Sequence, residues 1–184
     1  MRMTVYLLAV STVLVACSDS YTPGILYQAK SPACAIWSDG SRFELPKEID
    51  VFAGKPESGS ASSVDLSLAY FIPPAAAATF TNQVFAIAPP QSAETVRGTV
   101  TSIEQAVSPV RAATTVALAT LPDTLRAQSA TETTMYRIKI RFSGPIPDRF
   151  DFTPPRMLIG QDSYPVRTYT YRFFPDRKAY GLCT

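Results

Sequence analysis

The chain has 184 residues, of which 46% are hydrophobic and 17% are charged, and its formal net charge is +2. This balance excludes a disordered charged tail and a protein with several membrane spans. The absence of histidine excludes Ser-His-Asp and Cys-His catalysis in their usual form. Sixteen prolines against eight glycines indicate short segments separated by stiff turns, which favours strands over a helical bundle.

The first segment is apolar. It follows Arg2, runs from Val5 to Ala16, and ends at Cys17, directly before the polar residues Ser18–Ser20. A charged start, an apolar middle and a small residue at the border are typical of a secretory signal peptide. The run is shorter than the roughly 20 apolar residues that a membrane-spanning helix needs. We therefore expect residues 1–16 to be a signal peptide.

The border Leu14-Val15-Ala16-Cys17 resembles the lipobox of bacterial lipoproteins, in which an aliphatic residue and two small or aliphatic residues precede a cysteine. The resemblance covers only about the first seventeen residues. It implies that Cys17 receives a diacylglyceryl group, becomes the first residue of the mature chain, and is further acylated, for example with palmitate. Two or three acyl chains, at about 0.8 kcal/mol per buried methylene, form a stable anchor. Ser18, in place of Asp, implies the outer membrane.

The rest of the chain has the length of one domain. We expect residues 17–23 to be a lipidated tether and residues 24–184 to form a single β-rich periplasmic domain. Export passes through an oxidising compartment, so we expect a disulfide between Cys34 and Cys183. In the chain-entropy model a loop of this size contributes about 5 kcal/mol. The alternative is two separately buried thiols, whereas a metal site is disfavoured because two lone cysteines without histidine make a poor zinc set.

The residues from Asp65 to Ile72 predict a strand. Leu66, Leu68 and Tyr70 alternate with polar or small residues, and the Pro73-Pro74 pair marks the end of the strand.

The middle of the chain has a different spacing. Val96, Val100, Ile103 and Val107 are separated by four, three and four residues, as on one face of a helix. Gly98 and several threonines weaken this interpretation. We expect one or two helices between 93 and 126, with a long irregular insertion as the alternative.

The clearest pattern lies at 136–142, where four large apolar residues alternate with three cations. This predicts a half-buried strand with Tyr136, Ile138, Ile140 and Phe142 inward and Arg137, Lys139 and Arg141 outward. A last aromatic stripe, Tyr169, Tyr171 and Phe173, is either a glycan-binding face or, as we favour, part of the core. The predicted fold is mainly β: a β-sandwich or small barrel of short antiparallel strands, with a helical or irregular insertion around 93–126.

Charge is divided unevenly along the chain. From Thr134 onward nine basic residues stand against four acidic ones, whereas from Cys17 to Thr133 seven stand against eleven. One interpretation is a basic face that binds an anionic envelope partner. The other, which we favour, is that these cations pair across strands with acids from the first half. The candidate binding face comprises Arg137, Lys139, Arg141, Arg167 and Arg172.

No catalytic set is evident. The carboxylate pairs, Glu44 with Glu48, Glu48 with Asp50, and Asp148 with Asp151, are best interpreted as solvated acids, because linear spacing does not show the cleft that a glycosidase needs. We expect no catalytic residue, no metal and no cofactor.

These observations together predict a membrane-anchored lipoprotein of the bacterial envelope, in the outer membrane and facing the periplasm, with a non-enzymatic role in binding or assembly. The expected partners are the membrane, through the anchor, and envelope proteins or anionic envelope polymers, but not nucleic acid. Two alternatives remain: an accessory envelope hydrolase that uses a carboxylate pair, and a subunit of a secretion or appendage complex.

Overall fold

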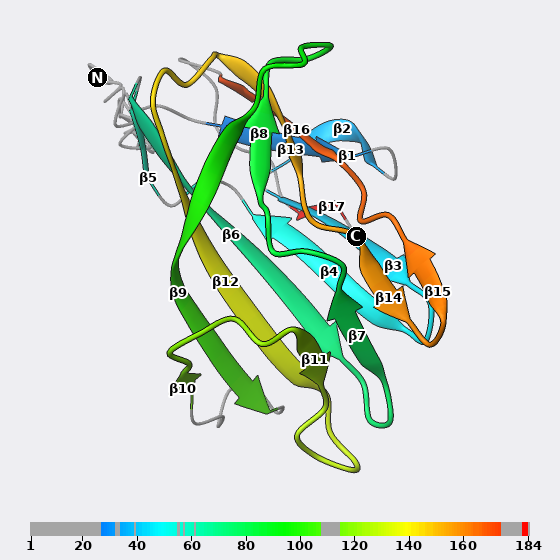
Figure 1. The fold of residues 1–184 in the computed structure, drawn as a ribbon. Coiled ribbons are helices and arrows are strands. Elements are labelled where there is room, and N and C mark those ends of the chain that lie inside the picture. Colours follow the sequence, from blue (N-terminus) through cyan, green and yellow to red (C-terminus); the bar gives the residue numbers. More distant parts are fainter. Residues whose placement is uncertain are drawn as a thin grey trace, which may run out of the picture.

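The computed structural model describes residues 27–31, 34–38, 40–54, 56, 58–60, 62–107, 115–173 and 182–183. These residues form two sheets and no helix (Figure 1). The prediction of a mainly β fold is confirmed.

The larger sheet has thirteen strands, nearly all paired antiparallel. Two of them lie off the main path: β5 (Ser58–Ser60) pairs with β6, and β10 (Val116–Ala117) pairs with β9. The main path runs in the order β17 (Leu182–Cys183), β3 (Gly40–Leu45), β4 (Ile49–Gly54), β6 (Ser63–Ile72), β12 (Thr134–Ser143), β9 (Val96–Val107), β8 (Ala86–Ala88), β13 (Arg149–Thr153), β16 (Tyr169–Phe173), β1 (Tyr27–Ser31) and β2 (Cys34–Ser38).

This sheet curves into a nearly closed, barrel-like shape. Its two ends approach each other, since β1 lies near β3 and β17 lies near β2 (Figure 1).

The smaller sheet has the order β11 (Thr124–Arg126), β7 (Ala77–Phe80), β14 (Met157–Ile159) and β15 (Asp162–Tyr164). It packs against the inside of the large sheet, where the ring of Phe80 meets the ring of Tyr70 edge-on at 5.6 Å. The fold therefore combines barrel and sandwich features.

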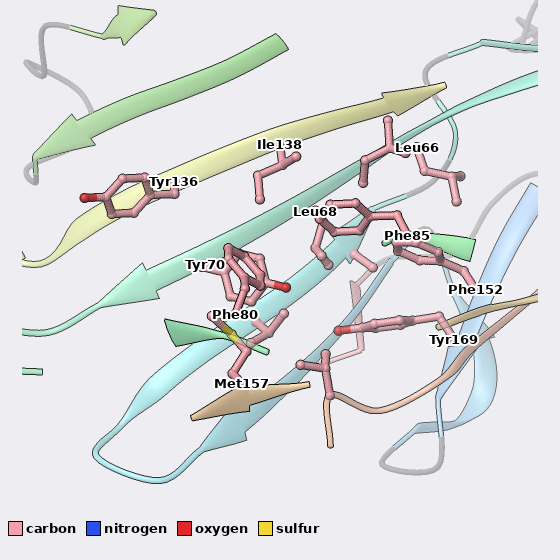
Figure 2. Close-up of a cluster of buried hydrophobic side chains, with 14 of the residues drawn as sticks. Leu66, Leu68, Tyr70, Phe80, Phe85, Tyr136, Ile138, Phe152, Met157 and Tyr169 are labelled. Carbon is pink, nitrogen blue, oxygen red and sulfur yellow. The ribbon is translucent and has the colours of Figure 1, made fainter. Parts of the chain in front are cut away.

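The core follows the predicted alternation. Strands β6 and β12 pair over ten residues, which places Leu68 opposite Ile138 and Tyr70 opposite Tyr136, all of them buried (Figure 2). Tyr169 and Tyr171 of β16 are also fully buried, so these two aromatic residues belong to the core. The side chain of Phe173 lies outside the described residues.

The prediction of helices between 93 and 126 is wrong for the described part of this segment. Residues 96–107 form the long strand β9, residues 116–117 and 124–126 form β10 and β11, and 108–114 lie outside the description. The cause is an irregularity in β9: Ile103 pairs with Ile138 and Val100 with Ile140, which leaves one extra residue, Thr101, on β9. In a regular strand, residues that share a face are two or four positions apart, as Val96 and Val100 are, and as Ile103 and Val107 are. The extra residue Thr101 makes the step from Val100 to Ile103 three, so this strand has the spacing of four, three and four that is typical of a helix.

Gly98 is explained by the same pairing. It lies opposite Phe142 on the inner face of the sheet, and a Cβ atom built on it would be 2.4 Å from Cγ2 of Ile140 and 2.6 Å from Cε1 of Phe142. Only glycine leaves room there for these two large side chains. The strand β9 therefore requires Gly98, the residue that is unfavourable in a helix.

Candidate functional site

Cys17 and the whole segment 1–26 lie outside the described residues. The first described residue is Tyr27, at the start of β1, which pairs with Phe173 of β16. The signal peptide, the lipid attachment at Cys17 and the tether therefore stay predictions.

Cys34 and Cys183 are described only through their backbone. Cys34 begins β2, and Cys183 ends β17, where it pairs with Ser41 of β3. Strand β17 also lies near β2, so the two cysteine-bearing strands are neighbours at the closing edge of the large sheet. The disulfide itself stays a prediction.

The three cations of β12 lie on the outer face of the sheet, as predicted. Arg141 donates two hydrogen bonds to the carboxylate of Asp65, at 2.7 Å and 2.8 Å, and Arg137 donates one to Glu104 at 3.3 Å. On strands β3 and β4, Arg42 and Asp50 form a similar pair. Both acids that bind β12, Asp65 and Glu104, come from the acidic segment between Cys17 and Thr133, because β6 and β9 flank β12. The cross-strand pairing that we favoured is therefore what the structure shows for Arg137 and Arg141.

The other two cations of the candidate binding face lie elsewhere. Arg172 is on β16, opposite Arg149 of β13, and Arg167 is in the segment that leads into β16. Strands β9, β8 and β13 separate β12 from β16 in the sheet. The five cations are thus divided between two regions of the surface.

The predicted carboxylate pairs do not face one another across a cleft. Glu44 and Asp50 are cross-strand partners on the outer face, and Arg42 binds Asp50. Glu48 lies in the turn between β3 and β4, with a φ of 59°. Asp151 accepts a hydrogen bond from the hydroxyl of Thr170 at 2.6 Å.

A groove over β8 is a concave feature of the described residues that the sequence did not reveal. It consists of two adjoining open hollows of about 430 Å³ and 630 Å³, which share Ile87, Ala88 and Thr95. Volumes of this size are usual for sites that hold a small ligand or a short segment of a partner. Its lining comes from segments far apart in the sequence, which is why no local motif indicated it.

The groove is mostly apolar, with a few polar groups. The larger hollow is lined by Pro145-Ile146-Pro147 and the smaller by Pro154-Pro155, which are stiff segments without backbone N–H donors at the prolines. Val84 is 45% exposed at the groove, although it is a large apolar side chain. Asp151 and Arg156 line one hollow and Glu94 the other. Arg156 is fixed by hydrogen bonds to the hydroxyl and the carbonyl oxygen of Ser163, at 3.1 Å and 3.2 Å.

Within the described ranges, no helix is long and apolar enough to span a bilayer. In the same part of the chain, no three or more cysteine or acidic side chains gather as metal ligands would. No family model, no curated protein and no solved structure matches the chain.

Proposed function

We propose that this chain is a lipid-anchored protein of the bacterial outer membrane that binds or assembles with other envelope components in the periplasm, without catalysing a reaction. The observation that carries the proposal is the motif Leu14-Val15-Ala16-Cys17 at the border between an apolar and a polar segment. Tyr27 lies ten positions after Cys17, so at about 3.5 Å per residue the chain between them spans at most about 35 Å. Anchoring at this range raises the effective concentration of envelope partners, so that modest contacts suffice.

The groove over β8 is the proposed binding surface of this protein. Its support is the combination of an apolar lining, an exposed Val84 and fixed polar groups at its sides. The partner classes are an envelope protein or an anionic envelope polymer. In the first case the protein would serve as a subunit of a larger envelope machine, such as a secretion or appendage complex.

The anchor is tested by replacing Cys17 with serine in the full-length gene and fractionating the cells. The parent protein is expected in the membrane fraction, with an intact mass that lacks residues 1–16 and carries the acyl chains. The Cys17→Ser variant is expected to keep its leader or to leave the membrane, whereas a Ser18→Ala control remains lipidated. A variant that fractionates like the parent contradicts the proposal.

The groove is tested with a photo-crosslinking residue at two matched positions. Val84, at the groove, and Val116, outside it, are both large apolar residues about half exposed. Crosslinking in intact cells is expected to capture a specific envelope component from position 84 and not from position 116. Equal capture at both positions would argue against the groove.

The hydrolase remains the second candidate, because Glu94 and Asp151 line the two adjoining hollows of the groove. Two carboxylates on opposite sides of a substrate are the requirement for glycoside hydrolysis. Purified protein that releases sugars from envelope polysaccharide, and loses this activity in both Glu94→Gln and Asp151→Asn, would favour the hydrolase over a binding role.

A further inference from the structure

Two tyrosine hydroxyls in the core have no hydrogen-bond partner among the residues that the structure describes. Tyr70 and Tyr169 are both fully buried, and no protein group described in the structure bonds to either Oη atom. Two other core tyrosines differ in this respect. Tyr171 donates a hydrogen bond from its hydroxyl to the carbonyl oxygen of Gly54 at 2.8 Å, and Tyr136 donates one to the carbonyl oxygen of Arg126 at 2.8 Å.

The two unpartnered hydroxyls point toward each other across the interior. Tyr70 is on β6 and Tyr169 on β16, and four strands separate these two along the sheet, so the hydroxyls approach from opposite walls. Figure 2 shows both oxygen atoms directed into the space between the two rings. Their proximity also appears in the pKa of Tyr169, which burial raises and to which Tyr171 and Tyr70 add.

Both rings are held in place by neighbouring aromatic residues. Phe80 packs edge-on against Tyr70 with ring centroids 5.6 Å apart, and Tyr169 lies 5.8 Å from Phe43 and 6.2 Å from Phe152. Neither hydroxyl therefore swings out to solvent without disrupting the core. Interiors are close-packed and deform little, so the arrangement persists in the folded protein.

A buried hydroxyl without a partner is costly, and native proteins satisfy nearly all such groups. Phenylalanine at either position would pack equally well without this cost. The pair of hydroxyls therefore indicates a site for a small molecule that both donates and accepts hydrogen bonds.

We propose that Tyr70 and Tyr169 form an internal binding site for a single water molecule that bridges their hydroxyl groups. Water fits because buried waters bond to otherwise unpaired polar groups in protein interiors, and because water both donates and accepts hydrogen bonds. The bridge links β6 to β16 and so ties the two walls of the barrel-like sheet together from the inside.

A crystal structure of the protein at high resolution provides the direct test. The expected result is density for one water at about 2.8 Å from both Oη atoms. Clear density for both rings with none between them would overturn the proposal.

Chemical denaturation of Tyr→Phe variants provides the second test. Tyr70→Phe and Tyr169→Phe are each expected to lower the folding equilibrium constant about fivefold, the usual effect of losing one hydrogen bond. The double variant is expected to lower it by less than the product of the two single effects, because the water is already lost in either one. Tyr136→Phe, which removes hydrogen bonds to Arg126 and Gln105 on the other side of β6, should combine independently with Tyr169→Phe, because Tyr136 and Tyr169 share no hydrogen-bond partner among the described residues. Single variants as stable as the parent, or two independent effects at Tyr70 and Tyr169, would count against the bridge.

Discussion

Gly98 of β9 lies directly opposite Phe142 of β12, and the ring of Phe142 occupies the place where a side chain at position 98 would be. A Cβ atom at this position would be 2.6 Å from Cε1 of Phe142, which is closer than Cβ atoms approach other atoms in real structures. The two residues are 44 positions apart in the sequence, so their relationship exists only once β9 and β12 are paired.

Gly98→Ala is accordingly expected to destabilise the domain. The added methyl group would push Ile140 and Phe142 out of their positions, and overpacking of this kind costs about 1–3 kcal/mol. Urea denaturation measures the change in the free energy of unfolding. Thr99→Ala, at the adjacent exposed position of the same strand, serves as the control and should change it little. A Gly98→Ala variant as stable as the parent would mean that β9 and β12 are not paired in this register.

The ion pair of Arg141 and Asp65 is expected to stabilise the outer face only at low ionic strength. Both partners are accessible to solvent, with side-chain exposures of 56% and 21%, so salt screens their attraction. Arg141→Gln, Asp65→Asn and the double variant form a cycle whose coupling energy should be small in dilute buffer and vanish in concentrated salt. A coupling that persists in concentrated salt would indicate a pair less accessible than its geometry implies.

Stability is expected to fall steeply at alkaline pH. Burial raises the pKa of Tyr70, Tyr169 and Tyr171 above the ordinary value of about 10, because the phenolate form loses its hydration. In the unfolded chain these groups ionise near pH 10, while in the folded protein they stay neutral, so the unfolded state is favoured as the pH rises above that value. Above pH 10, each of these tyrosines lowers the free energy of unfolding by about 1.4 kcal/mol per pH unit, and the three together lower it by about 4 kcal/mol per unit.

Phenolate absorbance and circular dichroism, followed together during an alkaline titration, measure this effect. The buried tyrosines should ionise only as the sheet signal is lost, and Tyr70→Phe should reduce the slope of stability against pH by about a third. Ionisation of Tyr70, Tyr169 and Tyr171 before the sheet signal is lost would contradict their burial.

The predicted disulfide between Cys34 and Cys183 is tested by mass spectrometry of protein isolated without reducing agent. A peptide pair linked through these two cysteines is the expected result, and reduction should lower the free energy of unfolding by up to about 5 kcal/mol. Cys34→Ser and Cys183→Ser are expected to be equally destabilised, because each removes the same bridge. Two free thiols in the native protein would contradict the predicted disulfide.

The sequence by itself determined the features that depend on residues close together in the chain. The alternation at 136–142 was enough to place Tyr136, Ile138, Ile140 and Phe142 inward, since a strand turns successive side chains to opposite faces whatever its partners are. The mainly β fold followed from such alternation and from the prolines. The motif Leu14-Val15-Ala16-Cys17, from which the proposed anchor is inferred, is equally local.

Only the tertiary structure decided what depends on pairing between distant segments. A helix and an irregular strand both fit the spacing of Val96, Val100, Ile103 and Val107. The segment is a strand because it pairs with β12, where its apolar residues cover the apolar face of the sheet. The same pairing placed Asp65 and Glu104 beside the cations of β12. The groove over β8 and the facing hydroxyls of Tyr70 and Tyr169 arise likewise from chain closure, because they join residues that no local pattern connects.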